Sequence, residues 1–163
     1  MPAAPVASRG FTLVELIVVL AVLGIVLGIA IPNFQRVIVS NRMAAQANDV
    51  IAALSLARSE AVKRAAQVTV CASSDRATCT GGWAQGWIVR DAAGNVLRVF
   101  GPLSGNSTLA GAPQIVFTAT GGTTLLAGTM LQLCPPAPAV VEGRAIEIER
   151  SGRPRVANTN LCP

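Results

Sequence analysis

An unbroken run of apolar residues near the N-terminus constrains this chain more than any other feature of its sequence. Residues 16–31 read LIVVLAVLGIVLGIAI, without a polar side chain. Counted from Phe11, the stretch is interrupted only by Thr12 and Glu15. A helix of that length extends about 31 Å, which is enough to cross the hydrocarbon core of a bilayer. Since buried helices of soluble proteins rarely lack a polar face, we expect a membrane-spanning helix over residues 11–31.

A cleavable secretory signal peptide is the main alternative. Such a peptide has an apolar core of about 7–15 residues followed by a small-x-small cleavage site. Here the apolar run is longer, and it ends in IPNF, residues 31–34. The segment before it, MPAAPVASRG, carries one charged side chain, Arg9. The sequence therefore favours a span that is retained in the mature protein.

The composition argues against an enzyme. The 163 residues include no His, which excludes Ser-His-Asp and Cys-His catalysis as well as His-ligated metal sites. The sequence also lacks a clustered pair of acids for general acid–base chemistry. We therefore expect no catalytic residue, no metal and no cofactor.

Glu15 is the anomaly of the apolar stretch. An ionised carboxylate in the middle of a bilayer costs about 2.5–3.5 kcal/mol, and less near the end of a span. Either Glu15 reaches the interface, or it has a partner that compensates its charge.

The string RGFTLVEL, residues 9–16, resembles the class III leader and N-terminal helix of type IV pilins and pseudopilins. The resemblance implies that prepilin peptidase cuts between Gly10 and Phe11 and methylates Phe11. It also implies that Glu15 pairs with the N-terminal amine of a neighbouring subunit in a filament. Pro32 matches the family's Pro just past the apolar segment, and since it removes one backbone donor we expect it to kink or locally loosen the helix. The leader would lie in the cytoplasm, the single span in the inner membrane and the head in the periplasm, although counting Arg residues around the span weakly favours the opposite orientation.

The remainder of the chain predicts an α+β arrangement in which one long helix packs on an antiparallel sheet. Between residues 33 and 66 there is no Gly or Pro, and small apolar residues recur at helical spacing. These are Ala47, Val50, Leu54, Ala57, Ala61 and Ala65. We expect strands at residues 67–72, 86–90, 96–100, 114–118, 129–134 and 144–150, with a hairpin turn at residues 93–95 and a mobile loop at residues 101–113.

Three segments of the helix and head resemble the GspH/FimT branch of the pseudopilins. They are ARSEAVKR (57–64), VTVC (68–71) and WAQGWIV (83–89). The resemblance implies the type IV pilin fold and a place among the minor pilins of type IV pili or the minor pseudopilins of type II secretion. We interpret Trp83 and Trp87 as core residues rather than as a stacking surface for bases.

All four cysteines lie in the head, which suits an oxidising compartment. Four cysteines allow three disulfide connectivities. We favour the local pairing, Cys71 with Cys79 and Cys134 with Cys162, with loop-closure contributions of about 2.5 and 3.5 kcal/mol.

The segment Gly152-Arg153-Pro154-Arg155 is the candidate binding site of the head. Two Arg side chains two residues apart in extended chain project from the same side, and guanidinium groups suit phosphate oxygens. Arg144 and Arg150 would widen the patch. The alternative is an ordinary hairpin tip, because residues 134–163 contain four Arg and three Glu. The segment is similar to the G-R-x-R motif of FimT-type minor pilins, which implies non-specific binding of double-stranded DNA during natural transformation.

These inferences divide the chain into a leader (1–10), a membrane-spanning half-helix (11–31), a periplasmic half-helix (32–66) and a β-rich head (67–163). The predicted function is that of a minor pilin at the tip or initiation complex of a type IV pilus. The alternative is a GspH-type minor pseudopilin of the type II protein secretion system. In both cases the partners are prepilin peptidase, the inner membrane and other pilins or pseudopilins.

Overall fold

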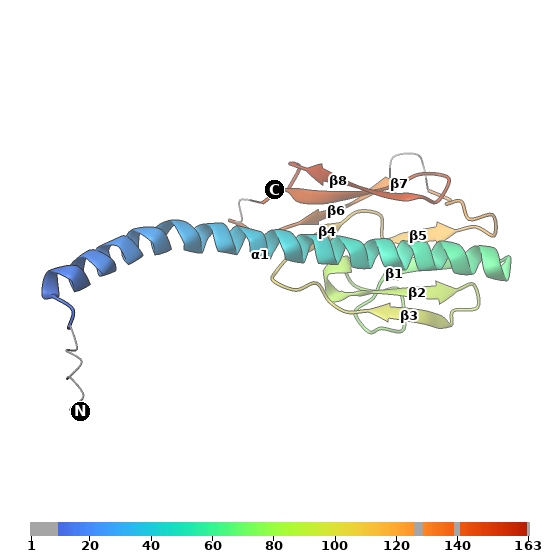
Figure 1. Ribbon diagram of the computed structural model, residues 1–163. Helices are drawn as coiled ribbons and strands as arrows, with labels where there is room; N and C mark the ends of the chain where they lie inside the picture. The colour runs from blue at the N-terminus through green and yellow to red at the C-terminus, as the bar shows by residue number, and fades with distance from the viewer. Residues whose placement is uncertain (1–9, 126–128, 139–140, 163) are drawn as a thin grey trace, which may run out of the picture. The chain divides into compact units, whose positions relative to one another are not determined.

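The computed structural model describes residues 10–125, 129–138 and 141–162 (Figure 1). The chain forms two compact units, Met1–Val37 and Ile38–Pro163. One helix, α1 (Leu13–Arg64), contributes residues to both units. The predicted leader lies outside the described residues except for Gly10.

The first unit contains the apolar part of α1. Each of its large apolar side chains from Leu13 to Phe34 exposes at least 45% of its surface. The helix passes through Pro32 without ending there, so the two predicted half-helices form one continuous helix. A helix that presents apolar side chains on all faces requires lipid or other helices around it.

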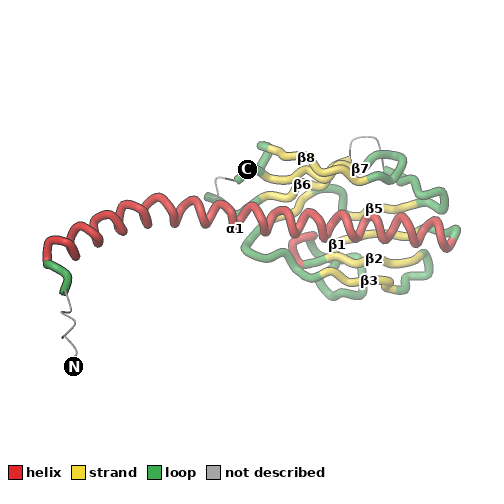
Figure 2. The backbone as a smooth tube through the Cα atoms, viewed as in Figure 1, coloured by secondary structure: helices red, strands yellow, loops and turns green. Residues whose placement is uncertain are grey.

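In the second unit, α1 packs on the strands through a face made largely of alanine. Figure 2 shows this part of the helix running along the strands of the head. The buried residues of α1 are Met43, Gln46, Ala47, Val50, Ala53, Leu54, Ala57 and Ala61. The stripe predicted from the sequence is therefore the buried face, except for its last member, Ala65.

Ala65 is exposed because the helix ends one residue before it. Ala65 has a φ of 49°, and its amide donates to the Val62 carbonyl at 3.2 Å. The Ala66 amide donates to the Ala61 carbonyl, also at 3.2 Å. This pair of bonds is the Schellman arrangement that closes many helices.

The strands form two antiparallel four-stranded sheets. Sheet A has the order β3-β2-β1-β5 and sheet B the order β4-β6-β7-β8. Sheet A consists of β1 (Val68–Ala72), β2 (Trp87–Asp91), β3 (Val96–Phe100) and β5 (Gln114–Phe117). Sheet B consists of β4 (Thr108–Ala110), β6 (Thr129–Cys134), β7 (Gly143–Ile148) and β8 (Pro154–Thr159).

Both sheets contribute to one hydrophobic core with α1. Leu54 of the helix, Phe117 of sheet A and Ile146 of sheet B are fully buried in the same cluster. Burying a side chain of this size stabilises the folded state by about 1.5–3 kcal/mol. The α+β fold class predicted from the sequence is confirmed.

Six of the eight strands lie where the sequence predicts them, and β4 and β8 were missed. The predicted mobile loop at residues 101–113 contains β4, and the segment is tied to the helix by a hydrogen bond from Gln46 Nε2 to the Ser104 carbonyl at 2.9 Å. The segment predicted as a loop therefore contains a short strand and is attached to the helix.

Both tryptophans are core residues, as expected from the sequence. Trp83, in the short helix η1 (Trp83–Gln85), is 4% exposed, and Trp87 is 2% exposed. Trp83 Nε1 donates to the Ala112 carbonyl at 3.0 Å. The ring of Trp87 stacks on Phe100 with centroids 5.6 Å apart. Neither indole face is available to stack on a base.

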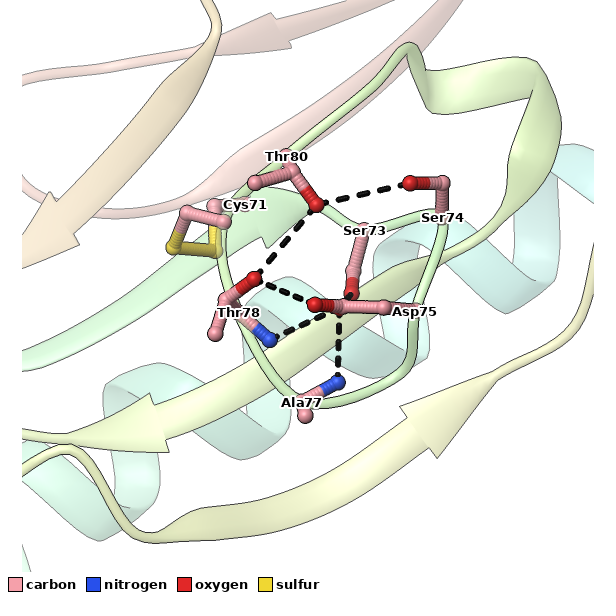
Figure 3. Close-up of a disulfide and its surroundings, with 8 residues drawn as sticks. Cys71, Ser73, Ser74, Asp75, Ala77, Thr78 and Thr80 are labelled. Atoms are coloured by element: carbon pink, nitrogen blue, oxygen red, sulfur yellow. Dashed lines mark hydrogen bonds between the residues drawn. A yellow bond between two sulfur atoms is a disulfide. The ribbon is translucent and has the colours of Figure 1, made fainter.

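The structure contains the local disulfides, Cys71–Cys79 and Cys134–Cys162. The first closes the loop between β1 and η1, which is organised around Asp75 (Figure 3). The Asp75 carboxylate accepts hydrogen bonds from the Thr78 amide at 2.8 Å and the Ala77 amide at 2.9 Å, and also from the Thr78 and Ser73 hydroxyls. Led by the bond from the Thr78 hydroxyl, these interactions hold the pKa of Asp75 well below its ordinary value of 3.8.

The low pKa of Asp75 predicts a pH-dependent contribution to stability. The ionised carboxylate stabilises the loop above its ordinary pKa, and this stabilisation is lost as the pH falls through the lower pKa of the folded state. Asp75→Ala should therefore lower the urea concentration at the unfolding midpoint, and its difference from the wild type should shrink as the pH falls below 3.8. Tryptophan fluorescence of the chain in non-ionic detergent measures this midpoint.

Asp49→Ala is the control for Asp75→Ala. Asp49 is an exposed carboxylate on α1 that accepts no hydrogen bond within the described part of the chain. A difference between wild type and Asp75→Ala that does not change with pH would contradict the role assigned to the carboxylate.

Candidate functional site

The candidate processing motif belongs to the first unit and surrounds the start of α1. Gly10 and Phe11 are exposed and precede the helix. Thr12 caps the helix, because its Oγ1 accepts a hydrogen bond from the Glu15 amide at 3.3 Å. A Cβ built on Gly10 would meet no atom within 4 Å. The Gly10–Phe11 peptide bond therefore lies in exposed chain before the helix.

Glu15 lies in the first turn of α1 and is exposed. A carboxylate at a helix N-terminus interacts favourably with the helix dipole. The described residues place no cation beside it. The apolar helix behind it has a mean hydropathy of 3.0 in its most apolar window, with none of that window buried, and is long enough to cross a membrane.

The basic segment of the head forms the end of the β7–β8 hairpin. The Gly152 amide donates to the Glu149 carbonyl at 2.8 Å, and the Glu149 amide donates to the Arg153 carbonyl at 3.2 Å. Gly152 has a φ of 75°, the left-handed conformation that this kind of hairpin requires. The strand expected at 144–150 ends at Ile148, and Arg155 lies on β8 instead of in the turn.

The four predicted arginines do not form one patch. Arg150 and Arg153 are exposed in the hairpin end, and their side chains have no partner among the residues that the structure describes. Arg144 lies at the opposite end of β7, where its guanidinium donates to the Asn158 side chain. Arg144 is therefore separated from the others by the length of the strand.

An acidic residue already engages Arg155. Arg155 Nε lies 3.3 Å from Glu149 Oε1. The other oxygen of this carboxylate accepts a hydrogen bond from the Ser151 hydroxyl at 3.1 Å. Because the Arg155 side chain is 73% exposed, the ion pair is worth little in water and an incoming phosphate can compete for the guanidinium.

The hairpin end is fixed to the rest of the head by close contacts between backbones. A Cβ on Gly152 would lie 2.0 Å from the Gly121 carbonyl oxygen. That carbonyl accepts a hydrogen bond from Arg58 Nε at 3.0 Å. Beside it, the Thr123 amide donates to the Arg150 carbonyl at 3.0 Å. We call the contact among Arg58, Gly121 and Gly152 the hairpin clamp.

Sequence reasoning missed Arg58 and Gly121. The two are 63 residues apart, and neither lies in a local motif that links it to the hairpin. In the sequence, Gly121 resembles a glycine that only marks a loop between two strands, and Arg58 resembles the other polar residues outside the buried stripe. The local sequence contains no signal for this contact, because it arises only when the helix and both sheets have packed.

Comparisons with known proteins match one sequence family and one N-terminal motif. Residues 46–152 match the profile of the type II transport protein GspH family. Residues 6–31 match the prokaryotic N-terminal methylation motif. The GspH match ends at Gly152, so Arg153, Arg155 and β8 lie outside it. A search of curated protein sequences finds no significant match.

Two kinds of solved structure share the fold. The type IV minor pilin FimU of Pseudomonas aeruginosa has a TM-score of 0.62 at 22% sequence identity, and the similarity covers 76% of this chain and 97% of FimU. The minor pseudopilin EpsH of the type 2 secretion system of Vibrio cholerae has a TM-score of 0.53 at 16% identity, covering 72% of this chain and 97% of EpsH. At these identities the similarity establishes the fold alone.

The hairpin clamp predicts that Gly152→Ala is more destabilising than an ordinary substitution at a positive φ. Gly94 provides a matched control, because it ends the β2–β3 hairpin with the same pair of bonds and has a φ of 91°. A Cβ on Gly94 would meet no atom within 4 Å. Both variants lose about 1–2 kcal/mol from the left-handed backbone, but only Gly152→Ala also forces the Gly121 carbonyl to move.

Urea unfolding followed by tryptophan fluorescence compares the two variants. The expected result is a lower midpoint for Gly152→Ala than for Gly94→Ala. Equal midpoints would mean that the contact with Gly121 adds nothing to stability.

Proposed function

The chain belongs to the type II transport protein GspH family, and we propose that it is a minor pilin at the tip or initiation complex of a type IV pilus. The match to the N-terminal methylation motif at residues 6–31 carries the filament-subunit part of this proposal, because it joins a processing site to a helix suited to a filament core. The role is structural, and we expect no enzymatic activity.

The proposed mechanism begins with processing in the inner membrane. Prepilin peptidase removes the leader after Gly10 and methylates Phe11, while the apolar helix remains in the lipid with the head in the periplasm. Entry into a filament then transfers the exposed apolar side chains of residues 13–34 from lipid to the helices of other subunits. No apolar surface needs to enter water at any stage, so the transfer avoids a cost of about 25 cal/mol per Å².

In this mechanism, Glu15 guides docking through its charge. A carboxylate held among apolar helices is costly unless a cation compensates it. The amine of Phe11 on a neighbouring subunit is such a cation, and it exists only after the leader has been removed. Processing therefore precedes assembly in the proposed order of events.

A minor pseudopilin of the type II secretion system is the second candidate. The family description, type II transport protein, favours it, and EpsH shares the fold. The leader and α1 have the same role in both candidates, so only the cellular filament to which the chain belongs separates them.

We further propose that the hairpin end of the head binds double-stranded DNA. The support is the pair of exposed, unengaged side chains of Arg150 and Arg153, with Arg155 in a weak ion pair beside them. Few phosphates can contact so small a site. Binding is therefore expected to be weak, indifferent to sequence and reduced by salt with a slope set by the few phosphates contacted.

Glu15→Ala tests the assembly mechanism. The variant should lose its leader like the wild type, because Glu15 lies outside the cleaved bond, but it should be absent from sheared filaments. Immunoblots of membranes and of sheared pili measure both steps. Gly10→Ala is the control, since it should retain the leader.

Three outcomes of this experiment discriminate among the proposals. Incorporation of Glu15→Ala at the wild-type level would remove the proposed role of Glu15. Normal processing of Gly10→Ala would remove the proposed cleavage site. A wild-type chain that is absent from pili but required for protein secretion would favour the pseudopilin candidate.

The double substitution Arg153→Gln/Arg155→Gln tests DNA binding. Removing two phosphate contacts should make the slope of log K against log salt shallower by about 1.8. Fluorescence anisotropy with duplex DNA at several salt concentrations measures this slope for the full chain in non-ionic detergent. Binding by the double variant that equals wild-type binding would exclude the hairpin end as the DNA site.

A further inference from the structure

A shallow groove runs between the last turns of α1 and the start of β8. Its volume is about 460 Å³, and its walls are Ser55, Arg58, Ser59, Val62 and Lys63 from the helix and Pro154 from the strand. All of these residues lie in the second unit. The predicted DNA-binding arginines flank Pro154 on both sides in the sequence, so the groove adjoins the hairpin end.

The hairpin clamp fixes the distance between the two walls of the groove. Arg58 donates to the Gly121 carbonyl, and a Cβ on Gly152 would lie 3.3 Å from Arg58 Nε. A Cβ on Gly121 would lie 3.0 Å from Val62 Cγ2. The helix and the hairpin thus meet at two glycines, so the backbones that carry the cations of the two walls lie close together.

The charge of the groove is positive. Arg58 and Lys63 line it, and the nearest acid on the helix, Glu60, is outside the lining residues. Glu60 accepts a hydrogen bond from Arg64 at 2.7 Å and lies 3.7 Å from Lys63 Nζ. The bond from Arg64 lowers the pKa of Glu60. The Lys63 side chain is 77% exposed, so its long contact with Glu60 is easily exchanged for another anion.

The groove also offers a neutral donor. The Ser59 hydroxyl donates to the Leu56 carbonyl at 2.8 Å, whereas the Ser55 hydroxyl has no hydrogen-bond partner among the described residues. Serine hydroxyls and lysine ammonium groups are common contacts to phosphate oxygens and carry no sequence information.

From this arrangement we propose that the groove binds backbone phosphates of the same DNA duplex that the hairpin end contacts, with Lys63 and Ser55 as additional phosphate ligands. The proposal rests on DNA binding by the hairpin end. It extends the contact surface from one hairpin to two elements, so that the duplex lies across the hairpin and the last turns of α1. The additional contact would add phosphate ligands to a hairpin that has only two unengaged arginines.

Two opposite substitutions test the groove in the full chain in non-ionic detergent, with a fluorescent 16-base-pair duplex as the probe. Lys63→Gln should make the salt slope shallower by about 0.9, the value for one phosphate contact, and should weaken binding several-fold at low salt. Ser59→Arg adds a cation to the groove wall, and it should steepen the slope by a similar amount.

Arg76→Asn is the matched control for charge. It removes one positive charge from the exposed disulfide loop, and Asn tolerates the φ of 64° found there. Its slope should remain that of the wild type. If the salt slope changes as much in Arg76→Asn as in Lys63→Gln, the change in Lys63→Gln is due to net charge alone, and the proposal is overturned.

The remaining outcomes separate the groove from the hairpin end. If the wild type binds DNA, Arg153→Gln/Arg155→Gln does not, and both groove variants behave as wild type, the groove proposal fails while DNA binding by the hairpin end stands. If the wild type does not bind at low salt, both fail. If Lys63→Gln binds DNA normally but is missing from filaments, the groove is a contact for a neighbouring subunit instead.

Discussion

The packing of α1 against two separate sheets is the constraint on which the head depends. Leu54 of the helix is buried in one cluster with Phe117 of sheet A and Ile146 of sheet B, so one face of the helix covers apolar residues of both sheets. Ala53 and Ala57 are fully buried in the same cluster, and a larger side chain at either position would have to displace its neighbours. Arg58 follows Ala57 in the sequence, so a shift of the helix at this point would also disturb the hydrogen bond from Arg58 to the Gly121 carbonyl.

The same helix has to suit two different environments along its length. Its first part exposes apolar side chains on every face, and its second part has one buried face and several charged residues. The difference between the two parts of the helix follows from their composition and was predicted from the sequence. Six of the strands were also predicted, because apolar residues recur at the spacing of a helix or a strand and Gly and Pro mark the ends of each segment.

What the sequence did not predict has equally specific causes. β4 has only three residues, too few for an alternating pattern to be recognised. β8 is an edge strand that starts with Pro154 and exposes most of its residues, so it lacks the apolar alternation by which strands are identified.

The sequence identified the four arginines as candidate residues but could not show which of them lie together, because only the register of β7 and β8 shows that Arg144 lies away from the hairpin end. The groove could not be predicted, since residues distant in the sequence form its two walls.

The hairpin clamp also determines how a mechanical load would travel through the head. Tension applied at the hairpin end is carried by the hydrogen bond from the Thr123 amide to the Arg150 carbonyl, and in the same loop the Gly121 carbonyl is hydrogen-bonded to Arg58 of α1. This route lies outside the ladder of strands from β8 to β4. Part of a pull on the hairpin therefore reaches the long helix without passing through sheet B.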